Sequence, residues 1–283
     1  MAEPAVPGGQ GPLLSIRHLT KRFSNRGLFP AKANPVVALD GIDLTLQTRS
    51  TLALVGASGS GKTTLALCVP RLIEPDSGDL VYKGQNILAF DRSRILLLRR
   101  KIQVIFQHPA VAMNPRFSVI ELIEEPLRIQ RKASQQERQA KVLHVMESVG
   151  IPAVWAKRRP LELSGGQRQR VAIARALILE PELLILDEAL SSLDVPVRAQ
   201  ILDLLFRLQD ALSLTYLYIT HDLRLAAYIA DRIAVMHKGR IVEDGNTQEV
   251  FSNPQHLETR NLINSLPHLP PVLSTEDAET RNS

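Results

Sequence analysis

A glycine-rich run between two apolar segments limits most strongly what this chain folds into. The run GASGSGKTT, 56–64, follows the apolar, β-branched TLALV and precedes LALCVPRLI, which suits a helix. A strand, a tight turn and a helix therefore follow one another, and we expect the helix to reach about Ile73. The run fits the phosphate-loop pattern G-x-x-x-x-G-K-[ST], in the context that this pattern requires.

In such a loop the backbone N–H groups and the helix N-terminus surround the phosphates of a nucleotide. Lys62 is expected to reach the β- and γ-phosphates, and the Thr63 hydroxyl is expected to bind Mg²⁺. The alternative is a coincidental glycine turn, because the bare pattern arises by chance in on the order of 1% of chains of this length. We predict a nucleotide site made by Gly56, Ser58, Gly59, Ser60, Gly61, Lys62, Thr63 and Thr64.

Two carboxylates at the end of the apolar run LLILDE supply what a phosphate loop needs next. Asp187 is placed to hold Mg²⁺, directly or through water. Glu188 follows it and is placed to orient or deprotonate an attacking water. The alternative is an ordinary polar strand end, which the phosphate loop in the same chain makes less favourable.

Short strands alternate with helical segments along the chain, which predicts an α/β fold with a mostly parallel sheet. Between about 109 and 163 the pattern changes to helical periodicity with few strand signals. IAVMHKG and RIVEDG read as a hairpin near the end. We therefore expect a phosphate-loop domain that is interrupted by an inserted helical subdomain.

Composition limits the cellular setting of the chain. Its 283 residues carry 34 basic and 29 acidic side chains, an interspersed surface rather than a polycationic one. The single cysteine, Cys68, excludes an intramolecular disulfide and fits a reducing compartment. No stretch reaches the ~18–20 apolar residues of a membrane span, and MAEPAVPGGQGP does not read as a secretory signal.

The segment LSGGQ, 163–167, defines the class. Together with GASGSGKT, LLILDE and the histidine of ITHD, it makes the chain resemble an ATP-binding-cassette nucleotide-binding domain from about Leu13 to Pro267. The resemblance implies a phosphate-loop NTPase fold with an antiparallel β subdomain and the inserted helical subdomain. On its own chemistry, the small-residue start of a helix at LSGGQ is a second phosphate site. The family solution is a head-to-tail dimer with ATP between the loop of one subunit and LSGGQ of the other.

The resemblance also implies roles for further residues. Gln107, after KIQVIF, senses Mg²⁺ and the lytic water, so Thr63, Gln107 and Asp187 form the implied metal set. His221 contacts the γ-phosphate and holds Glu188, and these two residues with Gln107 form the implied catalytic set. Phe23 matches the aromatic residue that stacks on adenine, with a core phenylalanine as the alternative. The second phosphate site is implied to contact ATP through Ser164, Gly165, Gly166 and Gln167. The D-loop, Ser192–Asp194, is implied to contribute Asp194.

One departure from the family is that Ala189-Leu190 follows the glutamate where Pro-Thr is common. FQHPAVAMNPR, the long lead after Phe23 and the tail segment QHLETRNLINSLP resemble the dipeptide/oligopeptide/nickel importer branch. DEALSSLD and ITHDLRL most resemble its nickel-import ATPase. The cysteines that some members use for an iron–sulfur cluster are absent from the sequence, so we expect no cluster.

The resemblance implies an ATPase that works with membrane partners. These are two multi-spanning permease subunits, a sibling ATPase in a hetero- or homodimer, and an extracytoplasmic substrate-binding protein. The expected location is peripheral, at the cytoplasmic face of the cell membrane, with no direct contact to nucleic acid. The alternatives are a cytosolic cassette ATPase that acts on a soluble or nucleic-acid complex, and a scaffold without hydrolysis. A scaffold without hydrolysis would require Lys62, Glu188 or His221 to be missing, and all three are present.

The expected boundaries follow from these assignments. Residues 1–12 read as a disordered lead-in and 268–283 as a disordered tail, because both are rich in proline or polar residues. The nucleotide-binding domain is expected to occupy 13–267, with the helical subdomain at 108–163.

Overall fold

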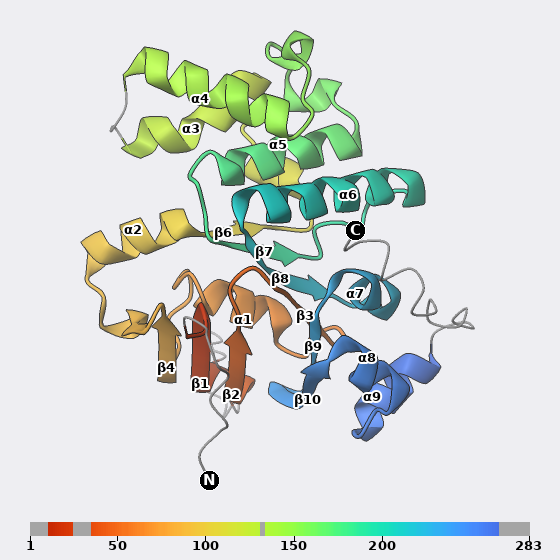
Figure 1. Cartoon of the computed structure of the whole chain (residues 1–283). Coiled ribbons are helices and arrows are strands. Elements are labelled where there is room, and N and C mark those ends of the chain that lie inside the picture. The colour runs from red at the N-terminus through yellow and green to blue at the C-terminus, as the bar shows by residue number, and fades with distance from the viewer. Residues whose placement is uncertain (1–10, 25–34, 131–133, 266–283) are drawn as a thin grey trace, which may run out of the picture.

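The computed structural model describes residues 11–24, 35–130 and 134–265, and its centre is one mixed sheet (Figure 1). Within these residues the strand order is β10-β9-β3-β8-β7-β6. Almost all of the expected lead-in 1–12 and all of the expected tail 268–283 lie outside the described residues. The strands are β3 Thr51–Val55, β6 Ile102–Ile105, β7 Leu183–Asp187, β8 Thr215–Thr220, β9 Arg232–His237 and β10 Arg240–Asn246.

The central sheet is mostly parallel, as predicted. β3 pairs in parallel with β8 and β9, β7 pairs in parallel with β8 and β6, and β10 joins β9 as the predicted antiparallel hairpin. Val55 lies opposite Thr220, and Asp187 lies opposite Ile219. The carboxyl ends of β3, β7 and β8 therefore meet at one edge of the sheet, where ligands bind in open α/β folds.

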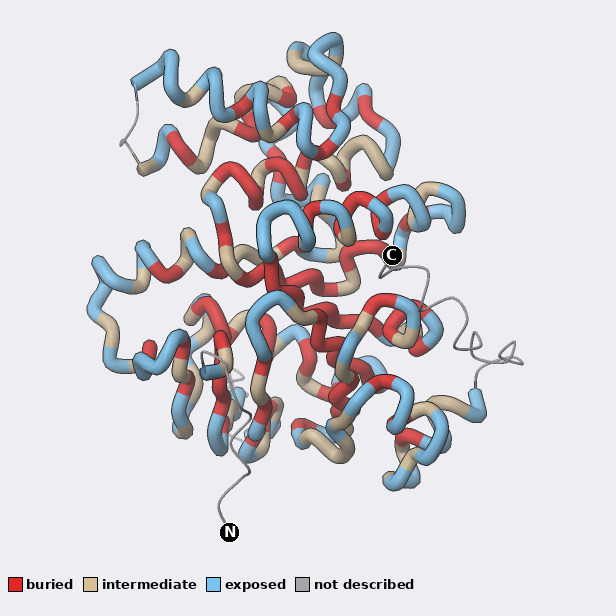
Figure 2. The backbone as a smooth tube through the Cα atoms, viewed as in Figure 1, coloured by how far each residue is buried: buried red, intermediate tan, exposed pale blue. Residues whose placement is uncertain are grey.

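The side chains of the central strands alternate between two apolar clusters, because successive residues of a strand point to opposite faces. On β7, Leu184 and Leu186 face a cluster shared with α5 and α6, whereas Leu183 and Ile185 face a cluster shared with α1. Figure 2 shows the buried residues concentrated along these strands and on the inner sides of the helices. These helices are α1 Lys62–Cys68, α5 Gly165–Leu177 and α6 Val195–Leu212.

A second, antiparallel sheet covers the α1 side of the molecule, which confirms the predicted antiparallel subdomain. Its order in the described residues is β2-β1-β4-β5. Its inward residues join the α1 cluster, which also buries Cys68. Burial raises the pKa of the Cys68 thiol to about 12, so this residue packs as a small apolar side chain. The strands are β1 Leu14–Phe23, β2 Val36–Leu46, β4 Ser77–Tyr82 and β5 Gln85–Asn86.

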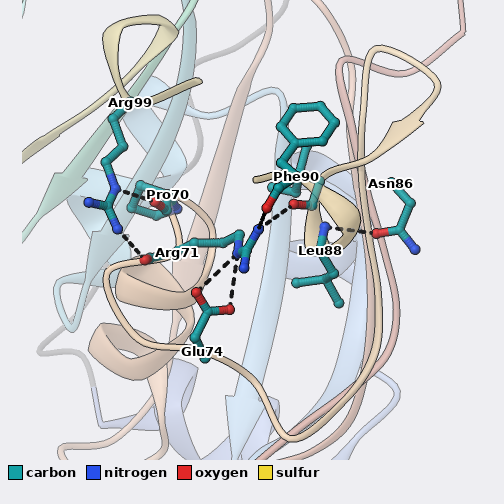
Figure 3. A network of polar contacts seen from close by, with 8 residues as sticks. Pro70, Arg71, Glu74, Asn86, Leu88, Phe90 and Arg99 are labelled. Atoms are coloured by element: carbon teal, nitrogen blue, oxygen red, sulfur yellow. Dashed lines mark hydrogen bonds and ion pairs between the residues drawn. The ribbon is translucent and has the colours of Figure 1, made fainter. Parts of the chain in front are cut away.

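The helix after the phosphate loop is shorter than predicted, because α1 ends at Cys68 instead of near Ile73. Pro70 has no N–H to donate to the preceding turn, and Arg71 takes a left-handed φ of 54°. Polar contacts hold the turn that follows (Figure 3). Arg99 donates to the carbonyls of Pro70 and Arg71, and Arg71 donates to Glu74 and to the carbonyl of Phe90.

The described residues between 108 and 163 form helical segments and no strand, as the pattern predicted. α4 begins with a capping box between Ser134 and Glu137. The apolar residues of these segments pack against α5, in the same cluster as β7. The boundaries 108–163 and 13–267 remain predictions. The segments are η2 Pro109–Ala112, α3 Val119–Gln130, α4 Gln135–Ser148, η3 Ala153–Trp155 and η4 Pro160–Glu162.

The remaining helices flank these units (Figure 1). The starts of α8 and α9 depend on side-chain caps from Asn246 and His256. None of the helices in the described part of the chain is long and apolar enough to cross a membrane. Their bounds are α2 Arg92–Lys101, α7 Leu223–Ile229, α8 Thr247–Ser252 and α9 Leu257–Asn264.

Candidate nucleotide site

The carboxyl edge of the central sheet gathers most of the predicted site residues. The phosphate loop follows β3, Asp187 ends β7, Glu188 comes next, and His221 follows β8. Gln107 lies two residues beyond the end of β6. Since these strands are parallel neighbours, residues far apart in the sequence meet there.

The phosphate loop has a backbone that its glycines make possible. Gly61, the N-cap of α1, has a φ of 111°, and a Cβ at this position would lie 2.3 Å from the carbonyl oxygen of Ala38. A side chain at Gly61 would therefore meet both backbone strain and a clash. Ser58 and Gly59 are exposed at the tip, whereas Ser60 is buried and its N–H donates to the carbonyl of Ala57.

Lys62 is buried within the loop although it carries a charge. Its Nζ donates to the carbonyls of Gly56 and Ala57, at 2.8 and 2.9 Å, and contacts Ser60 Oγ at 3.3 Å. Burial lowers the pKa of Lys62, and the nearby carboxylates of Glu188 and Asp187 oppose that shift. A buried ammonium beside a helix N-terminus and exposed loop N–H groups suits an anionic phosphate.

Asp187 provides the fit test for Mg²⁺. Its side chain is 5% exposed, and its Oδ1 is buried with no hydrogen-bond partner among the described residues. Burial raises the pKa of Asp187, whereas the Thr63 hydroxyl lowers it and the charge of Glu188 raises it further. A buried carboxylate oxygen without a partner, next to an exposed threonine hydroxyl, is a donor set that Mg²⁺ accepts. Thr63 and Asp187 therefore fit Mg²⁺, and their role as its ligands stays a prediction.

We expect Asp187→Asn to stabilise the protein when nucleotide and metal are absent. Since its pKa is raised, the folded protein favours the protonated carboxyl, and stability is lost as the pH rises through that pKa. Removing the charge should raise the free energy of unfolding at pH 7 by about 1–3 kcal/mol. The gain should shrink as the pH falls toward the ordinary aspartate pKa. Denaturant unfolding across pH measures it.

The control for this experiment is Asp203→Asn, the same change at an exposed position of α6. It should leave the free energy of unfolding unchanged. We also expect Mg²⁺ to raise the melting temperature of the ATP-bound wild type but not that of Asp187→Asn. A variant that is less stable than the wild type at neutral pH would contradict the burial cost assigned to Asp187.

Glu188 and His221 lie together at the same edge. His221 Nδ1 is 3.2 Å from Glu188 Oε1, and the histidine side chain is 60% exposed. Glu188 takes a left-handed φ of 48°, and its N–H donates to the carbonyl of Ile219 on β8. Strain of this kind in a non-glycine residue requires support from its surroundings. The strained backbone aims the carboxylate of Glu188 at the histidine.

Gln107 is connected to Glu188 through Ser191, a residue that the sequence analysis did not single out. Gln107 Nε2 donates to Ser191 Oγ at 3.2 Å, and Ser191 Oγ donates to the carbonyl of Glu188 at 2.8 Å. Ser191 therefore connects the end of β6 to the turn that holds the glutamate. Its position three residues after Glu188 was the available signal, because serine often closes such a turn with its own side chain.

Ala189 and Leu190, the departure from the family pattern, are both fully buried in the cluster that α5 and α6 share. They give the turn after Glu188 an apolar anchor. Phe23 lies elsewhere, at the end of β1, where 41% of its surface is exposed and Lys21 Nζ is 5.5 Å from the ring centroid. This exposure excludes the alternative of a core phenylalanine, and the stacking of Phe23 on adenine stays a prediction.

The LSGGQ segment begins α5 with a capping box. Ser164 Oγ accepts from the Gln167 N–H, and Gln167 Oε1 accepts from the Ser164 N–H. A Cβ on Gly166 would lie 2.4 Å from Val197 Cγ1, and one on Gly165 would lie 3.4 Å from a methyl of Leu193. The segment therefore packs against the D-loop and the start of α6. Asp194, the N-cap of α6, makes no side-chain cap within the described residues.

Comparison with known proteins agrees with this geometry. The family model described as ABC transporter matches residues 39–191. The dipeptide transport ATP-binding protein DppF of Haemophilus influenzae is 47% identical over 94% of this chain and 81% of its own length. The oligopeptide transport ATP-binding protein AppF of Bacillus subtilis is 40% identical over 91% of this chain and 79% of its own.

Two solved structures share the fold. CbiO1 from Clostridium perfringens, part of the CbiONQ transporter complex, is 29% identical with a TM-score of 0.75, over 86% of this chain and 91% of its own. The cassette MJ0796, solved as a dimer in a post-hydrolysis state with ADP and Pi, is 26% identical with a TM-score of 0.72. The match covers 83% of this chain and 98% of that chain.

The chain therefore belongs to the ABC transporter family and is an ATP-hydrolysing cassette of that family. Within the family its relatives include the ATP-binding proteins of dipeptide and oligopeptide transport, the branch that its sequence resembles.

Proposed function

We propose that this protein is the ATP-hydrolysing subunit of an importer that takes up di- or oligopeptides through partner membrane subunits. The observation that carries the proposal is the identity of 47% to a dipeptide transport ATP-binding protein over 94% of the chain. The relatives compared are named for peptide rather than nickel transport, so we propose a peptide cargo. A cassette that acts on nucleic acid is not favoured, because these relatives are transport proteins.

We infer a head-to-tail dimer with two ATP sites. The phosphate loop supplies one set of phosphate ligands, and the first turn of α5 at Ser164–Gln167 supplies another. In this chain that turn packs on α6 rather than on Lys62. A second subunit would place its own LSGGQ against the phosphate loop of the first. The dimeric state of the related MJ0796 cassette supports this arrangement.

Hydrolysis in this site would proceed from the groups of the chain itself. Lys62 and the loop N–H groups bind the phosphates and hold the γ-phosphate in place. Glu188 accepts a proton from the attacking water. At the same time the water oxygen bonds to the γ-phosphorus, and the bond between the γ-phosphorus and the oxygen that leaves with ADP breaks. His221 holds Glu188, and Gln107 acts on the same turn through Ser191. Thr63, Asp187 and Gln107 would hold Mg²⁺, which would neutralise phosphate charge.

Transport would follow from dimer closure and opening. ATP bridges two rigid bodies, and hydrolysis removes the bridge. Closure would move a helix of a permease subunit in a groove near Gln107 and the helical subdomain. The partners we propose are two permease subunits, a sibling ATPase and an extracytoplasmic binding protein, with this chain at the cytoplasmic membrane face. No iron–sulfur cluster is part of the proposal.

A pull-down with the Glu188→Gln variant tests this function. The tagged variant is recovered from gently solubilised native membranes with ATP present, because slow hydrolysis should keep the assembly closed. Mass spectrometry should then identify two multi-spanning proteins with a sibling ATPase. Glu147→Gln, the same change at an exposed position of α4, is the control and should recover less. Recovery of soluble or nucleic-acid-bound proteins alone would contradict an importer.

A further inference from the structure

A charged residue lies where the electrostatics of its own helix disfavour it. Arg198 is in the first turn of α6, four residues after the N-cap Asp194. The N-terminus of a helix carries partial positive charge, so a cation in this turn is unfavourable to the helix. The side chain of Arg198 is only partly exposed, at 25%. Its location therefore requires partners outside the helix.

Arg198 has partners on two separate segments. Its Nη2 donates to the carbonyl of Leu193, in the D-loop, at 3.1 Å. Its Nη1 lies 3.5 Å from Oδ2 of Asp222, the residue after His221. The planar guanidinium thus connects the D-loop backbone to the segment that carries the histidine. Its Nε is buried without a partner among the described residues, so the side chain is held by the two Nη contacts.

Asp222 is fixed independently of this contact. Its Oδ1 accepts from the N–H groups of Arg224 and Leu225 as the N-cap of α7. Its own N–H donates to Thr220 Oγ1 at the end of β8. Only Oδ2 remains to face Arg198. Because these contacts tie Asp222 to residues 220–225, a movement of that segment with His221 carries along a carboxylate whose second oxygen is in contact with Arg198.

The neighbour of Arg198 completes the connection to LSGGQ. Val197 fills the space beside Gly166, where an added Cβ would lie 2.4 Å from Val197 Cγ1. The first turn of α6 therefore contacts the histidine segment, the D-loop and the LSGGQ helix. The histidine segment serves the phosphate site of its own subunit. The D-loop and the LSGGQ helix serve the partner's site in a head-to-tail dimer.

We propose that Arg198 is a positioning residue that couples the two ATP sites of the dimer through its contacts with Asp222 and the Leu193 carbonyl. The proposal depends on the head-to-tail dimer of the proposed function. When His221 shifts with the γ-phosphate, Asp222 and Arg198 shift with it. The D-loop and the LSGGQ helix then carry that change to the site on the other subunit. Among the described residues, the polar contacts of Arg198 are with Leu193 and Asp222 and not with the phosphate loop, so we assign it a positioning role rather than a nucleotide-binding one.

Arg198→Gln tests the coupling in the full chain. Hydrolysis should lose cooperativity, with the Hill coefficient for ATP falling from about 2 toward about 1. The kcat should fall about tenfold through misplacement of the catalytic groups, while the KM for ATP stays unchanged because the phosphate loop is untouched. Arg207→Gln, the same change at an exposed position of the same helix, should match the wild type in all three quantities.

Asp222→Asn provides an independent test from the other side of the contact. Asparagine still caps α7 through its Oδ1, so only the charge facing Arg198 is lost. It should reproduce the loss of cooperativity, and the Arg198→Gln/Asp222→Asn double variant should be no worse than either single variant. Arg198→Lys should restore part of the cooperativity, because an ammonium keeps the charge but not the fork that reaches both partners.

Two results would overturn the proposal. One is an Arg198→Gln protein that matches Arg207→Gln in kcat and Hill coefficient. The other is a lower melting temperature with unchanged cooperativity, which is what a purely structural role predicts. A wild-type chain that stays monomeric with ATP would instead contradict the dimer. In that case a kcat unchanged by Arg198→Gln and Asp222→Asn would also refute the positioning role within one subunit.

Discussion

Glu188→Gln should leave ATP binding intact and lower the rate of hydrolysis by about 10²–10⁴, the usual contribution of a positioned general base. In the wild type, His221 Nδ1 lies 3.2 Å from Glu188 Oε1. Glutamine keeps the size of the side chain and this contact with His221, but it cannot accept the proton of water. The ATP-bound dimer should therefore persist. Phosphate release measures the first effect, and size-exclusion chromatography with and without ATP measures the second.

The matched control for this variant is again Glu147→Gln, which changes an exposed glutamate of α4. It should hydrolyse ATP like the wild type and form no persistent dimer. The strained φ of 48° at Glu188 is a backbone property, so glutamine should not relieve it, and the melting temperature should change little. Hydrolysis by Glu188→Gln at a near-normal rate would contradict its role as the base.

Much of the fold and the grouping of the site could be predicted from the sequence. The strands β3, β7 and β8 are short, apolar and bounded by turn or helix signals, so their existence and direction follow from pattern alone. Once they are parallel, the residues after them must meet at one edge. Glu188 and His221, 33 positions apart, are in contact for this reason.

The connections behind these residues could not be predicted, because they depend on side chains that meet only in the folded chain. Ser191 accepts from Gln107, 84 positions earlier in the chain, and donates to the carbonyl of Glu188. Its spacing from Glu188 predicts the turn contact, but no local pattern predicts the contact with Gln107. Arg198 reads as an ordinary surface arginine of an amphipathic helix until Asp222 appears beside it. The early end of α1 was visible in Pro70, but the apolar run beyond it outweighed that signal.

Lys62→Ala should weaken ATP binding by about 10- to 140-fold, the equivalent of the 1.5–3 kcal/mol that a charge-assisted hydrogen bond contributes. Its ammonium is the buried cation of the phosphate loop, so the charge of the β- and γ-phosphates would be left uncompensated. Titration calorimetry with ATP measures the affinity. Lys141→Ala, which removes an exposed lysine paired with Glu180 on the helical side, should bind ATP normally.

A structural cause for the loss at Lys62 must be separated from an electrostatic one. Lys62 donates to the carbonyls of Gly56 and Ala57, so its removal also takes a partner from the loop backbone. Lys62→Arg keeps the charge but is too bulky for the buried space between these carbonyls, and it should also bind weakly. If both variants fold with near-normal melting temperatures yet lose ATP, the loop acts as a phosphate site that depends on this ammonium. Tight binding by Lys62→Ala would instead assign the phosphate charge to the backbone N–H groups of the loop and to the helix N-terminus.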